Sequence, residues 1–301
     1  MRCPRFTELR YAAIGVAGAL LLIAPGCDST ATSKASPAKA SHAREIAASD
    51  FGRMRFDRST TIDNAWFPLR PGTQLVFDGS QRGDGGRIHH RQVFTVTDLT
   101  KVVDGVRTLI IWDRDYTEGR LVETELTFFA QDNRGNVWHL GQYPEVFENG
   151  KFVEAPAWLA GMKGGKAGIE MKAAPRLRAP DYSEGFAPPP INWVDHAKVY
   201  RTGAATCVPA GCYRNVLVIR EFETGKPEAY QVKYFARGVG NVRVGWAGRK
   251  DEDREILVLV KVNHLGPQAL ARIRAGALQL EKSAYKRSKQ VYGRTRPAVR
   301  R

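Results

Sequence analysis

The sequence has few cysteines and no long apolar run, and both absences exclude classes of protein. Four cysteines in 301 residues are too few for a small scaffold held together by disulfides. The uncharged apolar run from Tyr11 to Gly26 is shorter than the roughly 20 residues that a membrane-spanning helix needs. Hydrophobic residues make up 43% of the chain and charged residues 26%, which excludes a collagen, a coiled coil and a polytopic membrane protein.

The signature motifs of several common enzyme classes are also absent. The sequence contains no G-x-S-x-G, no Walker A motif, no G-x-G-x-x-G and no H-E-x-x-H, which mark hydrolases, nucleotide-binding folds and zinc proteases. His89 and His90 are adjacent, and adjacent side chains on a strand point to opposite faces, so they make no metal site. We therefore expect no metal, no cofactor and a non-catalytic protein rather than an enzyme.

The start of the chain has the composition of an export signal. Three arginines precede the apolar run, and small residues follow it, which predicts a secretory signal peptide over residues 1–26. Its end, A-P-G-C, resembles the lipobox of bacterial lipoproteins, in which a lipid is attached to the cysteine, here Cys27. The alternatives are a cleaved signal with an incidental cysteine and an uncleaved anchor helix.

Lipidation would place the protein in the cell envelope, anchored to a membrane. Asp28 resembles the inner-membrane retention signal of lipoproteins, so in a Gram-negative host we expect the outer face of the inner membrane. Residues 27–50 are rich in Ser, Thr and Ala and predict a flexible tether, because they lack apolar surface to bury.

Positive charge is concentrated at the end of the chain. The net charge is +15, and residues 282–301 contain eight basic residues and no acidic one. We expect a solvated basic tail over residues 286–301. Its possible partners are anionic lipid headgroups or an envelope polyanion, since an exported protein rarely meets nucleic acid.

Alternating apolar and polar residues dominate the middle of the chain, and this pattern predicts β-strands. The clearest cover residues 106–113, 121–130, 216–222, 230–234 and 256–262, and short Asn-, Asp- and Gly-containing turns separate many of them, so neighbouring strands are antiparallel. An apolar stripe at helical spacing predicts a helix from Pro267 to about Tyr285. We expect a mainly β domain over residues 51–285: one curved antiparallel β-meander, half-barrel or barrel-like, with a C-terminal helix docked on it.

Two details of this domain follow from residue spacing. Cys207 and Cys212 flank the turn residues V-P-A-G, and in an oxidising envelope this predicts a disulfide. Glu123 and Glu125 share one face of a strand whose other face is apolar, so we expect both carboxylates to point to solvent.

Residues 151–200 interrupt the strand pattern with many prolines and glycines and with large side chains. A long irregular segment inside a domain is usually functional or disordered, and the aromatic side chains argue against disorder. We expect it to cover the curved sheet and supply ligand-binding side chains: Trp158, Met162, Met171, Tyr182, Glu184 and Trp193. The same segment offers Asp181, Glu184 and Asp195 as acidic groups for catalysis.

These observations leave three functions open. The first is a tethered envelope lipoprotein, non-catalytic, that binds an apolar or amphipathic ligand on the curved sheet. The second is an envelope structural or interaction protein without a small ligand. The third is a hydrolase that acts on envelope material.

Three motifs resemble a group of exported bacterial proteins. They are N-A-W-F-P-L-R-P-G-T at residues 64–73, A-Q-D-N-R-G-N-V-W at 130–138 and K-Y-F-A-R-G-V-G at 233–240, and the resemblance spans roughly residues 59–245. It implies export and a β-rich fold, and it supplies no catalytic residues, because the group has no established activity. Members often have Gln-Glu where this chain has Ser183-Glu184.

Overall fold

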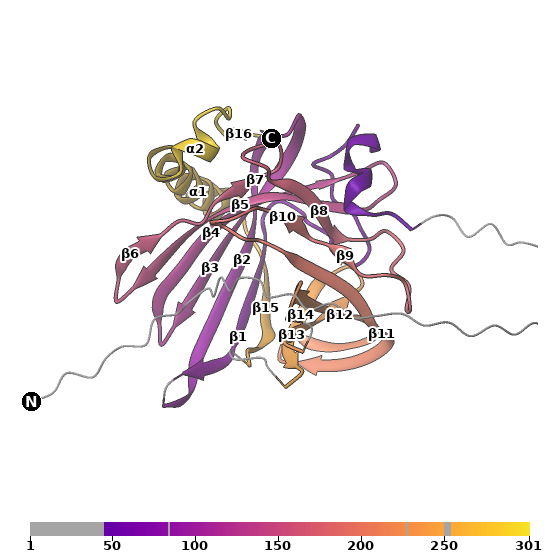
Figure 1. Ribbon diagram of the computed structural model, residues 1–301. Helices are drawn as coiled ribbons and strands as arrows, with labels where there is room; N and C mark the ends of the chain where they lie inside the picture. Colours follow the sequence, from indigo (N-terminus) through magenta and orange to yellow (C-terminus); the bar gives the residue numbers. More distant parts are fainter. Residues whose placement is uncertain (1–44, 84, 227, 250–253) are drawn as a thin grey trace, which may run out of the picture. The chain divides into compact units, whose positions relative to one another are not determined.

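The computed structural model describes residues 45–301 apart from 84, 227 and 250–253, and this part of the chain forms one unit (Figure 1). The signal peptide, Cys27 and the first part of the predicted tether lie outside the described residues. Glu45, the first described residue, is bound to the folded unit. It accepts a hydrogen bond from Lys172 Nζ at 3.0 Å and forms an ion pair with Arg176.

The prediction of a mainly β fold with a C-terminal helix is confirmed. The helices are the 3-10 helix η1 (Ala48–Arg53), α1 (Pro267–Arg287) and α2 (Lys289–Tyr292). The strands are β1 (Thr73–Gly83), β2 (Gly86–Val103), β3 (Val106–Thr117), β4 (Arg120–Gln131), β5 (Val137–Glu148), β6 (Lys151–Glu154), β7 (Trp158–Leu159), β8 (Lys166–Met171), β9 (Tyr182–Ser183), β10 (Gly185–Phe186), β11 (Asp195–Val208), β12 (Gly211–Glu223), β13 (Tyr230–Ala236), β14 (Gly240–Ala247), β15 (Ile256–His264) and β16 (Val299–Arg300).

Thirteen strands follow one antiparallel path, in the order β10-β8-β5-β4-β3-β2-β1-β15-β14-β13-β12-β11-β9. Consecutive hairpins make β1–β5 and β11–β15, and these two groups join where β1 pairs with β15. The sheet curls into a nearly closed barrel (Figure 1), as expected for a sheet with this many twisted strands.

Residues 182–186, which we call the seam, bring the two edges of the sheet together. Ser183 pairs with β11 and Gly185 pairs with β8, so one short segment is hydrogen-bonded to both edges. The backbone of β8 approaches the seam closely, because a Cβ added at Gly168 would lie 2.0 Å from the nitrogen of Gly185. The seam therefore depends on a glycine at residue 168.

The outer face of β2–β5 is covered by α1, as the apolar stripe predicts. Ala277, Leu280 and Ala284 of the helix are buried. Below them, Lys101 Nζ of β2 donates to Glu281 Oε1 at 2.9 Å and to the carbonyl oxygen of Arg296 at 2.6 Å. This buried ion pair joins the sheet, the helix and the chain that follows it.

The end of the chain is folded, which differs from the solvated tail expected from its charge. After α2 the chain returns to the sheet, where Val299 of β16 pairs with Thr100 of β2. The backbone N–H of Arg301 donates to the carbonyl oxygen of Asp98 at 2.9 Å. Most basic side chains of residues 286–301 are nevertheless exposed.

One end of the barrel is filled by Phe67. Its ring lies 5.4 Å from that of Phe129 on β4, 6.3 Å from that of Phe94 on β2 and 6.3 Å from that of Phe235 on β13, measured between ring centroids. Strands from both halves thus turn one face toward Phe67, and we call that face the inner face.

The chain around Phe67 is held by Asn64. Its side-chain oxygen accepts hydrogen bonds from the backbone N–H of Trp66 at 2.9 Å and of Phe67 at 3.2 Å, and its amide donates to Gly135. The motif N-A-W-F-P-L therefore has a structural role as an apolar plug.

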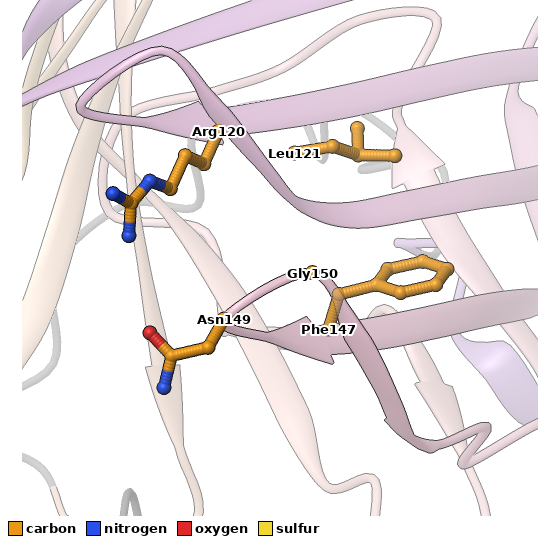
Figure 2. A pocket seen from close by; sticks show the side chains of 5 residues that line it. All are labelled: Arg120, Leu121, Phe147, Asn149 and Gly150. Carbon is orange, nitrogen blue, oxygen red and sulfur yellow. The ribbon is translucent and has the colours of Figure 1, made fainter.

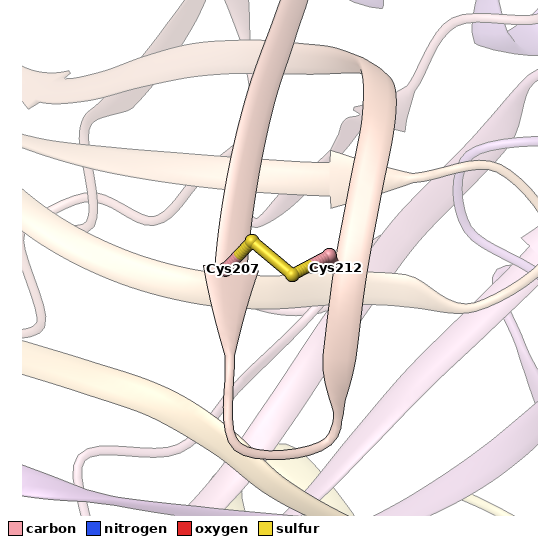
Figure 3. The surroundings of a disulfide bond; sticks show 2 residues. All are labelled: Cys207 and Cys212. Atoms are coloured by element: carbon pink, nitrogen blue, oxygen red, sulfur yellow. A yellow bond between two sulfur atoms is a disulfide. The ribbon is translucent and has the colours of Figure 1, made fainter.

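Cys207 and Cys212 are joined by a disulfide across the β11–β12 hairpin (Figure 3). The two residues pair directly in the register of that hairpin. The disulfide therefore links the two strands next to the turn between them.

We predict that Gly168→Ala destabilises the protein by about 3 kcal/mol, because the added methyl group would force β8 away from the seam. This corresponds to a melting temperature lower by roughly 6–12 °C, measured by circular dichroism. Gly52→Ala is the matched control, since a Cβ there meets nothing within 4 Å. Equal melting temperatures for the two variants would contradict the role of the seam.

Candidate functional site

The inner face changes from apolar to acidic along its strands. On β3, Leu109 and Ile111 lie toward the Phe67 end, and Asp113 and Asp115 follow on the same face. Side chains two apart share a face of a strand, so on β4 the face that begins with Phe129 continues to Glu125 and Glu123. Each of these strands therefore has an apolar end and an acidic end.

Nine carboxylates form this acidic interior. They come from β3, β4, β8, the seam, β11, β12 and the start of β15: Asp113, Asp115, Glu123, Glu125, Glu170, Glu184, Asp195, Glu221 and Glu255.

The expectation that Glu123 and Glu125 point to solvent is wrong. The apolar face of β4 packs outward, where Phe128 contacts Tyr292 of α2 with ring centroids 6.4 Å apart. The carboxylate face therefore points into the barrel. Alternation along a strand predicts one covered face and one face in bulk solvent, whereas the curling of this sheet encloses the second face inside the barrel.

Like charges lie directly opposite each other on β3 and β4. Asp113 pairs with Glu125, and Asp115 pairs with Glu123, an arrangement that destabilises a sheet. Burial, followed by the neighbouring carboxylates, raises the pKa of Asp113 well above its ordinary value. The same causes raise the pKa of Glu123 to about 9.

His90 offsets part of this negative charge. Its Nε2 atom lies 3.1 Å from Glu255 Oε1 and 3.5 Å from Asp115 Oδ1. Burial alone would lower the pKa of His90, but the hydrogen bonds and charges of the two carboxylates outweigh it and raise the pKa to about 10. His90 is thus a cation at neutral pH.

Lys233 on β13 is the centre of a second group of carboxylates. It forms an ion pair with Glu221 of β12. Burial opposes its charge, but Glu221, Glu184 and Glu170 outweigh that effect and raise the pKa of Lys233. Burial raises the pKa of Glu170 to about 7, with Lys233 opposing the shift. Lys233 therefore stays charged while the carboxylates around it tend to hold protons.

Glu184 is the seam residue of this second group. Burial and then the charges of Glu221 and Glu170 raise its pKa well above the ordinary value. Its backbone N–H donates to the carbonyl oxygen of Asp195 at 2.9 Å. Burial and then Glu221 raise the pKa of Asp195 to about 6.

The two groups belong to one interior that water can reach. Burial raises the pKa of Glu125 to about 7, and Lys233 on the opposite half of the barrel is among the charges that lower it. The side chains stay partly open to solvent: Lys233 is 28% exposed and Glu221 14% exposed. The acidic end of the interior is therefore hydrated, in contrast to the end filled by Phe67.

Tyr182 faces this interior with an unused hydroxyl. It pairs with Ala197, which pairs with Glu221 in turn, so the three side chains share the inner face. Tyr182 is 4% exposed, and among the described residues its hydroxyl has no hydrogen-bond partner. Burial raises its pKa, and the charges of Glu184, Glu221 and Glu170 raise it further.

The structure brings some of the predicted ligand-binding residues together and separates others. Tyr182 and Glu184 both lie in the acidic interior. Trp158 and Trp193 pack on His139, with ring centroids 5.0 Å and 5.9 Å from its ring. Burial lowers the pKa of His139 to about 4.

The two methionines lie outside the acidic interior. Of the carboxylates proposed for catalysis, Glu184 and Asp195 lie inside it and Asp181 does not. Met171 is buried in the apolar core, and Met162 lines a surface depression. Asp181 contacts His196 at 2.8 Å on the outer face, away from the interior. The ligand-binding role of all six residues stays a prediction.

Sequence reasoning missed most of the interior. The turn Glu118-Gly119 joins β3 to β4, and counting outward from it would align Asp115 with Val122 and Asp113 with Thr124. A register shift next to Asp115 instead places it opposite Glu123 and places Asp113 opposite Glu125. Glu170, Glu221 and Lys233 gave no signal either, because only the tertiary structure brings their strands together.

Two surface depressions accompany the interior. The first, of about 320 Å³, lies between the tips of the β3–β4 and β5–β6 hairpins and is lined by Arg120, Leu121, Phe147, Asn149 and Gly150 (Figure 2). The second, of about 420 Å³, is basic and is lined by Gly161, Met162, Lys163, Lys289, Gln290 and Arg294. Among the described residues, no group of three or more His, Cys, Asp or Glu side chains could hold a metal ion.

Comparisons with known proteins add little to this description. No family model matches the chain, and no curated protein matches it. The chain is similar to a solved structure from Bacteroides fragilis that is described as an exported protein with a YmcC-like fold, at 14% identity and a TM-score of 0.40, over 66% of this chain and 99% of that one. It is also similar to a Parabacteroides distasonis structure described as a lipoprotein, at 12% identity and a TM-score of 0.35, over 66% and 99% of the two chains. Neither similarity bears on the chemistry of the interior.

We predict that the stability of the protein falls as the pH rises from 5 to 9. The pKa is raised to about 7 for Glu125 and Glu170 and to about 9 for Glu123, from 4.5 in each case, and to about 10 for His90. A raised pKa means that the group binds its proton more tightly in the folded state than in the unfolded chain. The bound proton stabilises the fold fully at a pH below the pKa of the group in the unfolded chain. This stabilisation is lost as the pH rises through the pKa of the group in the folded state.

The melting temperature should fall by roughly 5 °C or more over this range, since one pKa unit is worth about 1.4 kcal/mol and each kcal/mol shifts the melting temperature by about 2–4 °C. Glu123→Gln should reduce the slope, whereas Glu154→Gln, at an exposed site on β6, should leave it unchanged. A melting temperature that stays constant or rises would contradict the ionisation scheme.

Proposed function

We propose that the protein is an envelope lipoprotein, tethered to a membrane through Cys27, that binds an amphipathic ligand and performs no catalysis. The observation that carries this proposal is the division of the inner face into a packed apolar end and a hydrated acidic end. A barrel interior that crowds partly buried carboxylates against one another is a destabilising arrangement, and such an arrangement supports a binding site.

The packing supports an amphipathic ligand rather than a wholly apolar one. Phe67 fills the apolar end through contacts with three other aromatic rings. The space that water reaches is lined by carboxylates, which an apolar molecule would leave without partners. The polar part of the ligand therefore enters the barrel, and its apolar part stays at the mouth or in the membrane.

Hydrolysis of envelope material is a second candidate, and one observation favours it. Glu184 and Asp195 are joined through the backbone, and both have raised pKa values, as a general acid requires. Asp181 does not join them. Accumulation of a shortened product from an envelope extract, lost in Glu184→Gln but not in Asp181→Asn, would favour this candidate over simple binding.

The test of the proposed function is native mass spectrometry of the full chain, extracted from the envelope of its own host in a non-ionic detergent. We expect a discrete extra mass that leaves on denaturation and is amphipathic after extraction. The denatured chain should begin at Cys27 and carry the mass of a lipid. Cys27→Ser should lack that lipid and keep the ligand. A bare chain, with no adduct from the native envelope, would contradict the binding function.

The basic end of the chain adds a contact with the membrane in this proposal. Lys163, Lys289 and Arg294 line one depression and would face anionic lipid headgroups. At about 1 kcal/mol per basic residue near an acidic surface, replacing all three by Gln should weaken sedimentation with phosphatidylglycerol vesicles roughly 100-fold. Arg120→Gln, at a hairpin tip elsewhere, is the control and should change little. Equal binding of the two variants would contradict the contact.

A further inference from the structure

We infer that the acidic interior binds a ligand with two or more protonated amines spaced along a flexible chain, held between the carboxylates of β3–β4 and those around Lys233. This inference rests on the proposed function and names the chemistry of the polar part of the ligand.

The first reason is the imbalance of charge inside the barrel. Nine carboxylates share the interior with the cations His90 and Lys233, which are paired with Glu255 and Glu221. The chain as a whole has a net charge of +15, yet acidic groups outnumber basic ones in the interior, and burial and mutual repulsion make Glu123 and Glu184 hold protons there. Among the described residues, most of these carboxylates have no basic partner, and a cationic ligand would supply one.

The second reason is the distribution of the carboxylates. Asp113 and Glu125 pair on β3 and β4, whereas Glu170 lies on β8 and Glu221 on β12. Because these carboxylates are spread across the barrel, a ligand with several cationic groups spaced along its length can contact more of them than one compact ion can. Ammonium groups suit such a site, because each has three donors and no acceptor.

The third reason is the hydroxyl of Tyr182. It is enclosed by protein, lies on the inner face with Ala197 between it and Glu221, and has no hydrogen-bond partner among the described residues. The charges of Glu184, Glu221 and Glu170 all act on it. A buried hydroxyl without a partner is unfavourable, and an ammonium group is one partner that could donate to it. The unused hydroxyl is therefore independent evidence of a missing partner on this face.

The test is titration calorimetry and thermal denaturation of the full chain in a neutral detergent, with spermidine as the probe at pH 8 and at pH 5. We expect saturable binding and a higher melting temperature at pH 8, and binding at least tenfold weaker at pH 5, where Glu125 and Glu170, with pKa values raised to about 7, hold protons. The controls are a monoamine and sodium chloride at matched ionic strength.

Variants separate a binding role from a structural one. Glu170→Gln should weaken spermidine binding at least tenfold, whereas Glu154→Gln should not. Tyr182→Phe should weaken binding roughly tenfold through the lost hydrogen bond without lowering the melting temperature of the ligand-free protein, because the hydroxyl has no partner there. A spermidine derivative with a dodecyl chain that binds more tightly than spermidine would identify an amphiphile headgroup, and equal affinity would identify a free polyamine.

Three results of the binding measurements would overturn the inference. They are no saturable binding of spermidine at pH 8, an effect equal to that of the monoamine or salt, and tighter binding of Mg²⁺ alone. A native adduct that is neutral or anionic would also overturn it while leaving the binding function intact. Absence of any native adduct, with spermidine still bound by the purified chain, would instead count against the proposed function.

Discussion

The structure depends on one constraint, the hydrogen bonding of residues 182–186 to both edges of a curled sheet. Ser183 holds β11 and Gly185 holds β8, and the close approach at Gly168 leaves no room for a side chain. Without this contact the sheet would be open, and its inner carboxylates would face bulk water as ordinary surface charges. Closure is what turns them into a confined group with raised pKa values.

Closure also decides how the two faces of the sheet are used. The outer face of β2–β5 packs against α1 and is fixed by the buried pair of Lys101 and Glu281, while the inner face is packed by Phe67 at one end only. The protein therefore accepts repulsion between facing carboxylates at the other end. A fold selected for stability alone would place apolar side chains there, and this local conflict with sheet stability is the observation on which the proposed binding site rests.

Much of the fold could be predicted from the sequence, because strand alternation, turn residues and the stripe of the helix are local signals. The long antiparallel strands, the docking of residues 267–285 and the curled sheet followed from them. The site was predicted less well. Tyr182 and Glu184 were chosen for their setting in an irregular segment, which proved to contain the seam. Glu123 and Glu125 were assigned to solvent, because a strand with one apolar face was taken to have one covered face.

The sequence by itself determined which residues alternate on each strand, where the chain turns and where positive charge gathers. It also predicts an export signal before the folded unit. Only the tertiary structure decided which side of the sheet is enclosed and brought Lys233 of β13 toward Glu125 of β4 and Glu170 of β8. The physical reason is that alternation along a strand sets which side chains share a face, whereas curvature and closure of the whole sheet set what that face meets.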